Sequence, residues 1–219
     1  MVKCVVFDFD GTLVDTLKDL CYSINEALKE NNYPVSYSLE ETKSLIGSGI
    51  RNLCKRAIKP FTSSEEEVDK LLGSFQKIYS LNQTRYSKPF YGIDYLLKWL
   101  NENKIKCAIL SNKKDEYTKE IASKLLDISL FSAIQGKEEN IPLKPDPTSL
   151  NLLLEKLKVS KKDVIYIGDS DVDMLTAKNG GVKSIGVLWG YRTRKDLEKY
   201  SPDFICSSIE EIIKIIKND

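Results

Sequence analysis

The amino-acid sequence predicts an α/β protein in which a doubly wound parallel sheet is interrupted by an inserted helical domain. Apolar runs of strand length alternate with helical patterns over residues 93–216, as consecutive β-α units do. The first strand-like run, Val2–Phe7, is separated from the next, Ile105–Leu110, by far more chain than one crossover helix needs. The intervening chain shows only helical periodicity, so we predict that it forms a domain of its own.

The first predicted strand ends in two acids. Residues 2–7 alternate too little for a half-buried strand, so we expect a central strand that is covered on both faces. Asp8 and Asp10 follow it, next to Gly11. Ligands bind outside the carboxyl ends of such strands, and two close carboxylates need a cation or a shared proton to offset their repulsion. The alternative is a polar turn in which an Asp caps a helix.

The inserted segment contains three apolar helical faces, at residues 17–28, 50–58 and 68–79. Pro89 and Gly92 then break the helical pattern and mark the return of the chain to the sheet. We therefore predict a core of residues 1–14 and 87–219 and a helical domain of residues 15–86.

The remaining chain alternates regularly between helices and strands, which is typical of a parallel sheet covered on both faces. The predicted helices are Ile93–Leu100, Glu116–Leu125, Thr148–Leu157, Val172–Asn179 and Ile209–Ile216. The predicted strands are Ile105–Leu110, Phe131–Ile134, Val164–Ile167, Lys183–Val187 and Phe204–Cys206.

Composition narrows the class of protein. The 219 residues are 42% hydrophobic and 30% charged, with a formal net charge of +1 and no long block of one sign, so we expect neither a nucleic-acid nor a membrane partner. We expect no signal peptide and no membrane span, because no apolar run is long enough. The five cysteines are odd in number and widely spaced, which favours reduced core residues in a cytoplasmic protein.

The chain contains no histidine. Its absence excludes every mechanism that needs a Ser-His or Cys-His pair or a histidine metal ligand. Acid-base chemistry must therefore fall to carboxylates, Lys, Tyr or Cys.

Polar side chains also follow other predicted strands. Ser111-Asn112 follows Leu110, Lys144 lies in a proline-rich connection, and Asp169 and Asp173 come after Val164–Ile167. Taken singly, Ser111, Asn112, Asp146 with Pro147, and Asp169 are each explained as helix caps, and a lone lysine as solvated surface. Together they place carboxylates, a hydroxyl and a lysine at one edge of the sheet, which independent capping rarely produces. We therefore predict a functional site there.

Four segments resemble, in order and spacing, the motifs of the haloacid dehalogenase-like hydrolase superfamily. They are D-F-D-G-T-L-V-D at Asp8–Asp15, Ser111-Asn112, Lys144-Pro145-Asp146-Pro147 and Gly168-Asp169-Ser170-x-x-Asp173. The resemblance spans nearly the whole chain, and a helical insert directly after the first motif agrees with it. G-V-L-W-G-Y-R at Gly186–Arg192 and Ile46–Gly49 are more narrowly similar to the phosphoglycolate phosphatase branch.

The resemblance implies a Rossmann-like core with a small all-helical cap domain. It implies that Asp8 is the nucleophile and Asp10 the general acid/base. Mg²⁺ would be held by Asp8, Asp169 and the Asp10 carbonyl, with Asp173 supporting the metal from nearby. The phosphoryl group would be bound by Ser111, Asn112, Lys144, Gly11 and Thr12. The expected partner is a small phosphorylated metabolite.

The residue types also suit this chemistry on their own terms. A phosphate monoester dianion repels a carboxylate, so attack by Asp8 needs Mg²⁺ and the Lys144 ammonium to offset the charge. An aspartyl-phosphate intermediate divides a very slow hydrolysis into two easier steps. Within the resemblance, the acid at Asp10 argues against a dehalogenase, because a halide leaves without a proton.

Other functions share these motifs. A phosphosugar mutase or a pyrophosphatase on the same core is the alternative enzyme, and a phosphonate-cleaving enzyme would need a Schiff-base lysine such as Lys43 or Lys55. From a different class, a phospho-aspartate signalling protein would be shorter and would lack the acid at Asp10.

The last candidate site lies in the inserted domain. Gly47, Ser48 and Gly49 separate two helical patterns, which predicts a tight loop before a helix that starts near Ile50. The free amides of that helix and Arg51 suit an anionic group distant from the phosphoryl group. The alternative is a simple helix-helix turn with a solvated Arg51.

Overall fold

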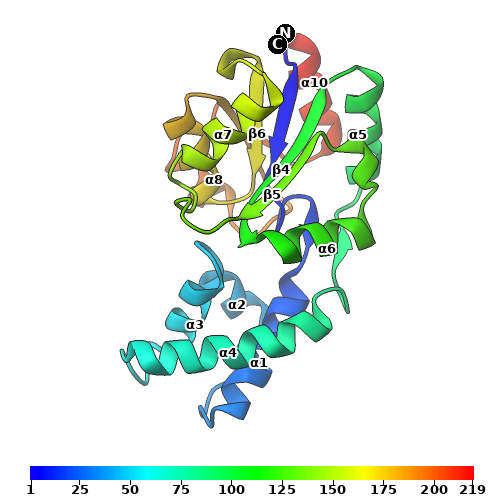
Figure 1. Ribbon diagram of the computed structural model, residues 1–219. Coiled ribbons are helices and arrows are strands. Elements are labelled where there is room, and N and C mark those ends of the chain that lie inside the picture. Colours follow the sequence, from blue (N-terminus) through cyan, green and yellow to red (C-terminus); the bar gives the residue numbers. More distant parts are fainter. The chain divides into compact units, whose positions relative to one another are not determined.

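The computed structural model describes all residues 1–219, and the chain separates into two compact units. The first unit consists of Met1–Asp15 and Pro89–Asp219, and the second of Thr16–Lys88. Figure 1 shows the elements of both units.

The first unit is built on a six-stranded sheet in the order β5-β4-β1-β6-β7-β8, and every recorded pairing is parallel. The strands are β1 Cys4–Phe7, β4 Lys106–Lys114, β5 Ala133–Lys137, β6 Val164–Gly168, β7 Lys183–Val187 and β8 Phe204–Cys206. β1 lies at the centre, where Val6 stands beside Ala108 of β4 and Tyr166 of β6. All four residues of β1 are buried, which confirms the predicted central strand.

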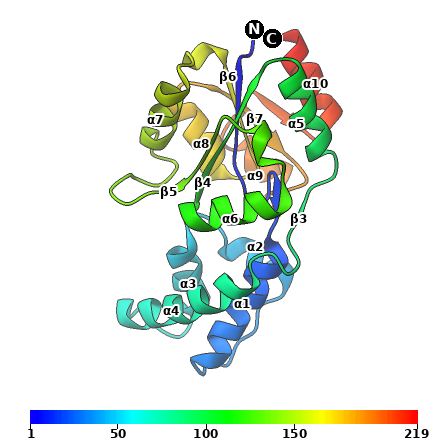
Figure 2. The same ribbon diagram turned by 45° about the vertical axis from the view of Figure 1, so that its right-hand side comes forward.

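Helices cover both faces of this sheet (Figures 1 and 2). α7 (Thr148–Leu157) and α8 (Asp171–Gly180) lie on one face, and α5 (Ile93–Glu102) and α10 (Ile209–Asn218) on the other. α6 (Asp115–Leu125) packs beside β4 and β5, and the short α9 (Arg194–Glu198) follows β7. Leucines of α7 and apolar residues of β1, β4 and β6 form one continuous core cluster. The doubly wound sheet is confirmed.

Several element boundaries differ from the sequence predictions. β4 continues to Lys114, so Ser111 and Asn112 lie in the strand, and the alternative in which one of them caps the next helix is wrong. β5 begins at Ala133 because a short 3-10 turn, Ile128–Leu130, occupies the chain before it.

Two expected helix caps also differ. The residue before α7 is Pro147, and Asp146 stands one position earlier, where its Oδ1 accepts from the Thr148 amide at 2.9 Å. The cap of α8 is Ser170, whose hydroxyl accepts from the Asp173 amide at 3.3 Å. Asp169 therefore does not cap α8; it lies between the end of β6 and the Ser170 cap.

The second unit is all-helical apart from its connections. It contains α1 Leu17–Glu30, α2 Leu39–Leu45, α3 Ile50–Ile58 and α4 Glu65–Asn82, and α1 packs along α4. Asp19 of α1 is fully buried and accepts bonds from the Tyr86 amide and from the amide and hydroxyl of Ser87. The chain connections to the first unit include β2 (Val14–Asp15) and β3 (Lys88–Pro89), a short paired sheet that periodicity did not predict.

None of the helices combines the length and the apolarity that a membrane span requires. All five cysteines are buried, and none forms a disulfide.

Candidate active site

The predicted site residues of the first unit gather at one edge of the sheet. Asp8 directly follows β1, Ser111 lies in the last part of β4, and Asp169 directly follows β6. β1 is paired with both β4 and β6, and in a parallel sheet the carboxyl ends of neighbouring strands meet at the same edge. The topology therefore brings together residues that are more than a hundred positions apart in the chain.

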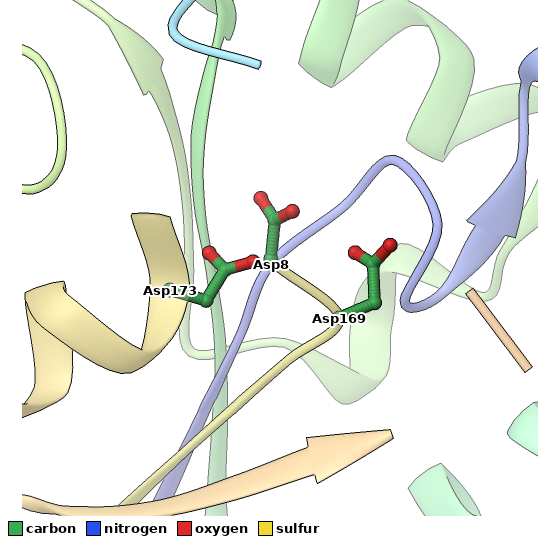
Figure 3. A group of neighbouring side chains, drawn as sticks. All are labelled: Asp8, Asp169 and Asp173. Atoms are coloured by element: carbon green, nitrogen blue, oxygen red, sulfur yellow. The ribbon is translucent and has the colours of Figure 1, made fainter. Parts of the chain in front are cut away.

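Three carboxylates form the centre of the site. Asp8, Asp169 and Asp173 each offer an oxygen, and these oxygens all lie within 4.8 Å of one another (Figure 3). All three side chains are buried. Burial, reinforced by repulsion from Asp173, raises the pKa of Asp169 to about 7 and raises that of Asp8 well above its usual range. Such a set favours either a bound proton or a bound cation.

The cluster fits a hard divalent cation. Its donors are carboxylate oxygens, which Mg²⁺ prefers, and the chain has no histidine to favour zinc. Both oxygens of Asp173 are already engaged, Oδ1 by Lys144 at 2.7 Å and Oδ2 by the Ser170 hydroxyl at 2.6 Å. Asp173 therefore has its charge offset by an ammonium, whereas Asp169 accepts from the uncharged Thr12 hydroxyl and Tyr191 amide and keeps its charge for a cation.

Two glycines leave the room that the Asp169 side chain occupies. A Cβ atom at Gly190 would stand 2.2 Å from the Cβ of Asp169, and one at Gly11 would stand 2.4 Å from its Oδ2. Gly11 also has a φ of +85°, which glycine adopts without strain. With the backbone this close, Asp169 accepts bonds from the Tyr191 amide at 2.7 Å and the Thr12 hydroxyl at 3.1 Å.

Lys144 links Asp8 to the rest of the cluster. Its side chain is 3% exposed, and its ammonium donates to Asp8 at 2.8 Å, Asp173 at 2.7 Å and the Tyr166 hydroxyl at 2.9 Å. Burial acts to lower the pKa of Lys144, but the carboxylates of Asp173 and Asp8 outweigh it and hold that pKa well above its usual value. Lys144 is therefore a permanent positive charge beside Asp8.

The second motif supports Lys144. The Asn112 side chain donates to the Lys144 carbonyl at 2.9 Å and accepts from the Lys144 amide at 2.8 Å. The side-chain amide of Asn112 is thus hydrogen-bonded through both its nitrogen and its oxygen to the backbone of Lys144. The hydroxyl of Ser111 is buried and accepts from the Lys113 amide at 3.2 Å.

Some site residues were missed by the sequence analysis. Lys113 is buried with its ammonium 3.1 Å from Oδ1 of Asp10. Tyr166 lies in an apolar strand, where nothing in the sequence separates a core tyrosine from a hydrogen-bonding one. Trp189 donates from its indole to the Thr12 carbonyl at 3.0 Å, and Tyr191 follows it in the Gly186–Arg192 motif. That motif was a usable signal for the last two residues.

The remaining candidates lie in the second unit. Gly47, Ser48 and Gly49 have φ values of 130°, 57° and 87°, and α3 begins at Ile50. The loop is held by Arg56, which donates to the carbonyls of Leu45 and Gly47 at 2.8 Å each.

Arg51 is half-exposed and pairs with two acids of α4, Glu65 at 2.7 Å and Asp69 at 2.9 Å. It is not a free solvated cation, and contact with an anionic ligand would compete with these two ion pairs.

A family model described as haloacid dehalogenase-like hydrolase matches residues 5–187. The chain belongs to this family. It is 33% identical over 218 residues to the phosphoglycolate phosphatase of Aquifex aeolicus, covering 99% of this chain and 98% of that one. Within the family, it belongs to the phosphoglycolate phosphatase-like branch, and it is a phosphoric monoester hydrolase.

Solved structures agree with the fold of the whole chain. A crystal structure from Lactobacillus delbrueckii subsp. bulgaricus is similar with a TM-score of 0.93 at 28% identity, covering 98% of both chains. A predicted phosphoglycolate phosphatase from Haemophilus somnus is similar with a TM-score of 0.90 at 29% identity, covering 98% of this chain and 97% of that one.

The raised pKa of Asp169 predicts how the stability of the metal-free protein depends on pH. An unfolded Asp titrates near 3.8 and the folded Asp169 near 7, so between these values the folded state binds more protons than the unfolded state. The contribution of Asp169 to the free energy of unfolding is therefore present below pH 4 and is lost as the pH rises to 7. Thermal melts in EDTA should show that Asp169→Asn stabilises the protein at pH 8 and has little effect at pH 4.5. An equal effect at both pH values would contradict the shifted pKa.

Proposed function

We propose that this enzyme is a Mg²⁺-dependent phosphatase that hydrolyses phosphoglycolate or a similarly small phosphorylated acid. The observation that carries the proposal is the contact of the buried Lys144 ammonium with Asp8, beside the acidic cluster. A carboxylate with a permanent cation at its side and further acids for a metal suits attack on a phosphate dianion. The names of the curated relatives support phosphoglycolate as the substrate.

The first chemical step transfers the phosphoryl group to Asp8. An oxygen of the Asp8 carboxylate attacks phosphorus, and the bond from phosphorus to the ester oxygen breaks, which leaves an aspartyl-phosphate. Asp10 in its protonated form gives a proton to the leaving alkoxide. Lys144 and Ser111 offer an ammonium and a hydroxyl to the oxygens of the phosphoryl group.

The second step regenerates Asp8. The carboxylate of Asp10 now takes a proton from a water molecule, which attacks phosphorus and releases phosphate from the aspartyl-phosphate. The same side chain thus serves as acid in the first step and as base in the second, and the enzyme returns to its starting protonation state.

The metal is assigned to the acidic cluster. Asp8, Asp169 and the carbonyl of Asp10 would hold Mg²⁺, with Asp173 as their support. When bound there, the cation supplies positive charge that offsets the repulsion between the phosphate dianion and the carboxylates. Gly11 and Thr12 would line the phosphate side of the first motif.

The second unit is proposed to act as a cap domain, with residues 15–86 as its extent. Gly47, Ser48, Gly49 and Arg51 would contact the part of the substrate that is distant from the phosphoryl group. The five buried, unbridged cysteines support a reducing compartment, and we place the enzyme in the cytoplasm.

Metal removal tests the proposed function. Treatment with EDTA should abolish phosphate release from phosphoglycolate, and Mg²⁺ should restore it, whereas Ca²⁺ should restore it poorly because of its looser coordination. Circular dichroism serves as the control that the metal-free protein stays folded. Full activity in EDTA, or no phosphate release from any small phosphate monoester with Mg²⁺, would overturn the proposal.

A further inference from the structure

A second buried lysine, Lys113, lies beside the proposed proton-transfer residue. Its side chain is 3% exposed, and its ammonium stands 3.1 Å from Oδ1 of Asp10, whose own side chain is 18% exposed. Lys113 follows Ser111-Asn112 in the extended end of β4. It is separate from Lys144, which contacts Asp8 and Asp173.

Burial makes this contact informative. A buried ammonium loses its hydration, and only a partner with good geometry compensates for that loss, so an ion pair of this kind restrains both side chains. Lys124 is an exposed lysine that pairs with Glu120 on the surface of α6. Such a surface pair is less restrained and contributes little to the stability of the fold.

The backbone of Asp10 is fixed independently of its side chain. Asp10 forms an isolated bridge with Val14, and the Gly11 amide donates to the Val14 carbonyl at 2.9 Å. This turn sets the position of the Asp10 Cα but does not by itself set the rotamer of the side chain. The Lys113 ammonium, 3.1 Å from Oδ1, is a contact that restrains this rotamer.

We propose that Lys113 is a positioning residue that holds the Asp10 carboxylate in the orientation needed for proton transfer. This inference rests on the proposed function, because it assigns Lys113 a task within that reaction. Proton transfer requires the donor and acceptor atoms within hydrogen-bond reach, and a displacement of about 1 Å can cost about 10²-fold in rate. Lys113 acts through Asp10 and is given no contact with the substrate.

The test uses two substrates that differ in their need for a proton. Alkoxide leaving groups, as in phosphoglycolate, need the proton from Asp10, whereas nitrophenolate leaves without one. Rapid mixing measures the first turnover alone, before water attacks the intermediate. Lys113→Met should slow the first turnover of phosphoglycolate by about 10²-fold and that of p-nitrophenyl phosphate by less than about threefold.

A double-mutant cycle provides the second readout. If Lys113 acts only through Asp10, then Lys113→Met should cause no further loss in an Asp10→Asn background. Lys113→Arg keeps the positive charge and should recover part of the rate on phosphoglycolate. Lys124→Met is the matched control, with the same charge change at an exposed site, and should behave as the wild type does.

The outcomes separate this inference from the proposed function. Equal losses on both substrates, or a further loss in the Asp10→Asn background, would overturn the role of Lys113 while leaving the phosphatase in place. An inactive wild type would instead overturn the proposed function. If Lys113→Met does not fold by circular dichroism, Lys113→Arg and Lys113→Gln carry the same comparison.

Discussion

Asp8→Asn should abolish phosphate release while leaving the protein folded. Asparagine keeps the shape of the side chain but removes the nucleophilic oxygen, so no aspartyl-phosphate can form and turnover should fall by at least about 10⁴-fold. The metal-free variant should also melt at or above the wild-type temperature at pH 8. The reason is that burial disfavours the ionised form of Asp8, as its raised pKa indicates, and asparagine is neutral.

Acid quenching and detection of phosphoprotein with a labelled substrate check the first part. The wild type should show a labelled intermediate and Asp8→Asn none. A labelled Asp8→Asn protein would mean that another residue is the nucleophile. Substantial turnover by this variant would likewise contradict the assignment of Asp8 as the nucleophile. Asp163→Asn is a control that changes an Asp paired with Lys3 at the opposite end of the sheet.

The architecture of the first unit could be predicted because its signals are local and strong. The strand lengths, the alternation with helices and the long gap before Ile105 are each visible in the sequence. The ends of elements were predicted less well where polar residues continue a strand. β4 continues through the polar residues Ser111 and Asn112, which a hydrophobic pattern cannot follow.

The acidic cluster could also be predicted, because acids at the ends of several parallel strands must meet at one edge. The bonds within the cluster could not. Lys113 and Tyr166 acquire their partners from segments distant in sequence, and a strand that ends in lysines or contains a tyrosine is ordinary on its own.

The loop before α3 shows the same limit. Its turn could be predicted from Gly47 and Gly49, but the clamp by Arg56 and the pairing of Arg51 with Glu65 depend on side-chain geometry. The local backbone is therefore predictable from composition, whereas the charged partners of each side chain require the fold.

Lys144→Met should cost both activity and stability, for two different reasons. The ammonium is the charge beside Asp8, the proposed nucleophile, and loss of one such preorganised donor typically reduces kcat by about 10²- to 10³-fold. Its removal also leaves Asp8 and Asp173 buried without their cation, and breaking a buried ion pair on one side destabilises by about 3–5 kcal/mol. Denaturant melts in EDTA and steady-state kinetics with Mg²⁺ measure the two effects separately.

A second substitution separates them further. Adding Asp173→Asn to Lys144→Met removes one of the two uncompensated carboxylates, so the double variant should regain part of the lost stability. Its activity should stay low, because no cation has returned to the side of Asp8. Recovery of both stability and activity would mean that Lys144 serves only to neutralise Asp173. Recovery of neither would mean that the losses come from the broken bond between Lys144 and the Tyr166 hydroxyl. Tyr166→Phe distinguishes the last case, because it removes only that hydroxyl.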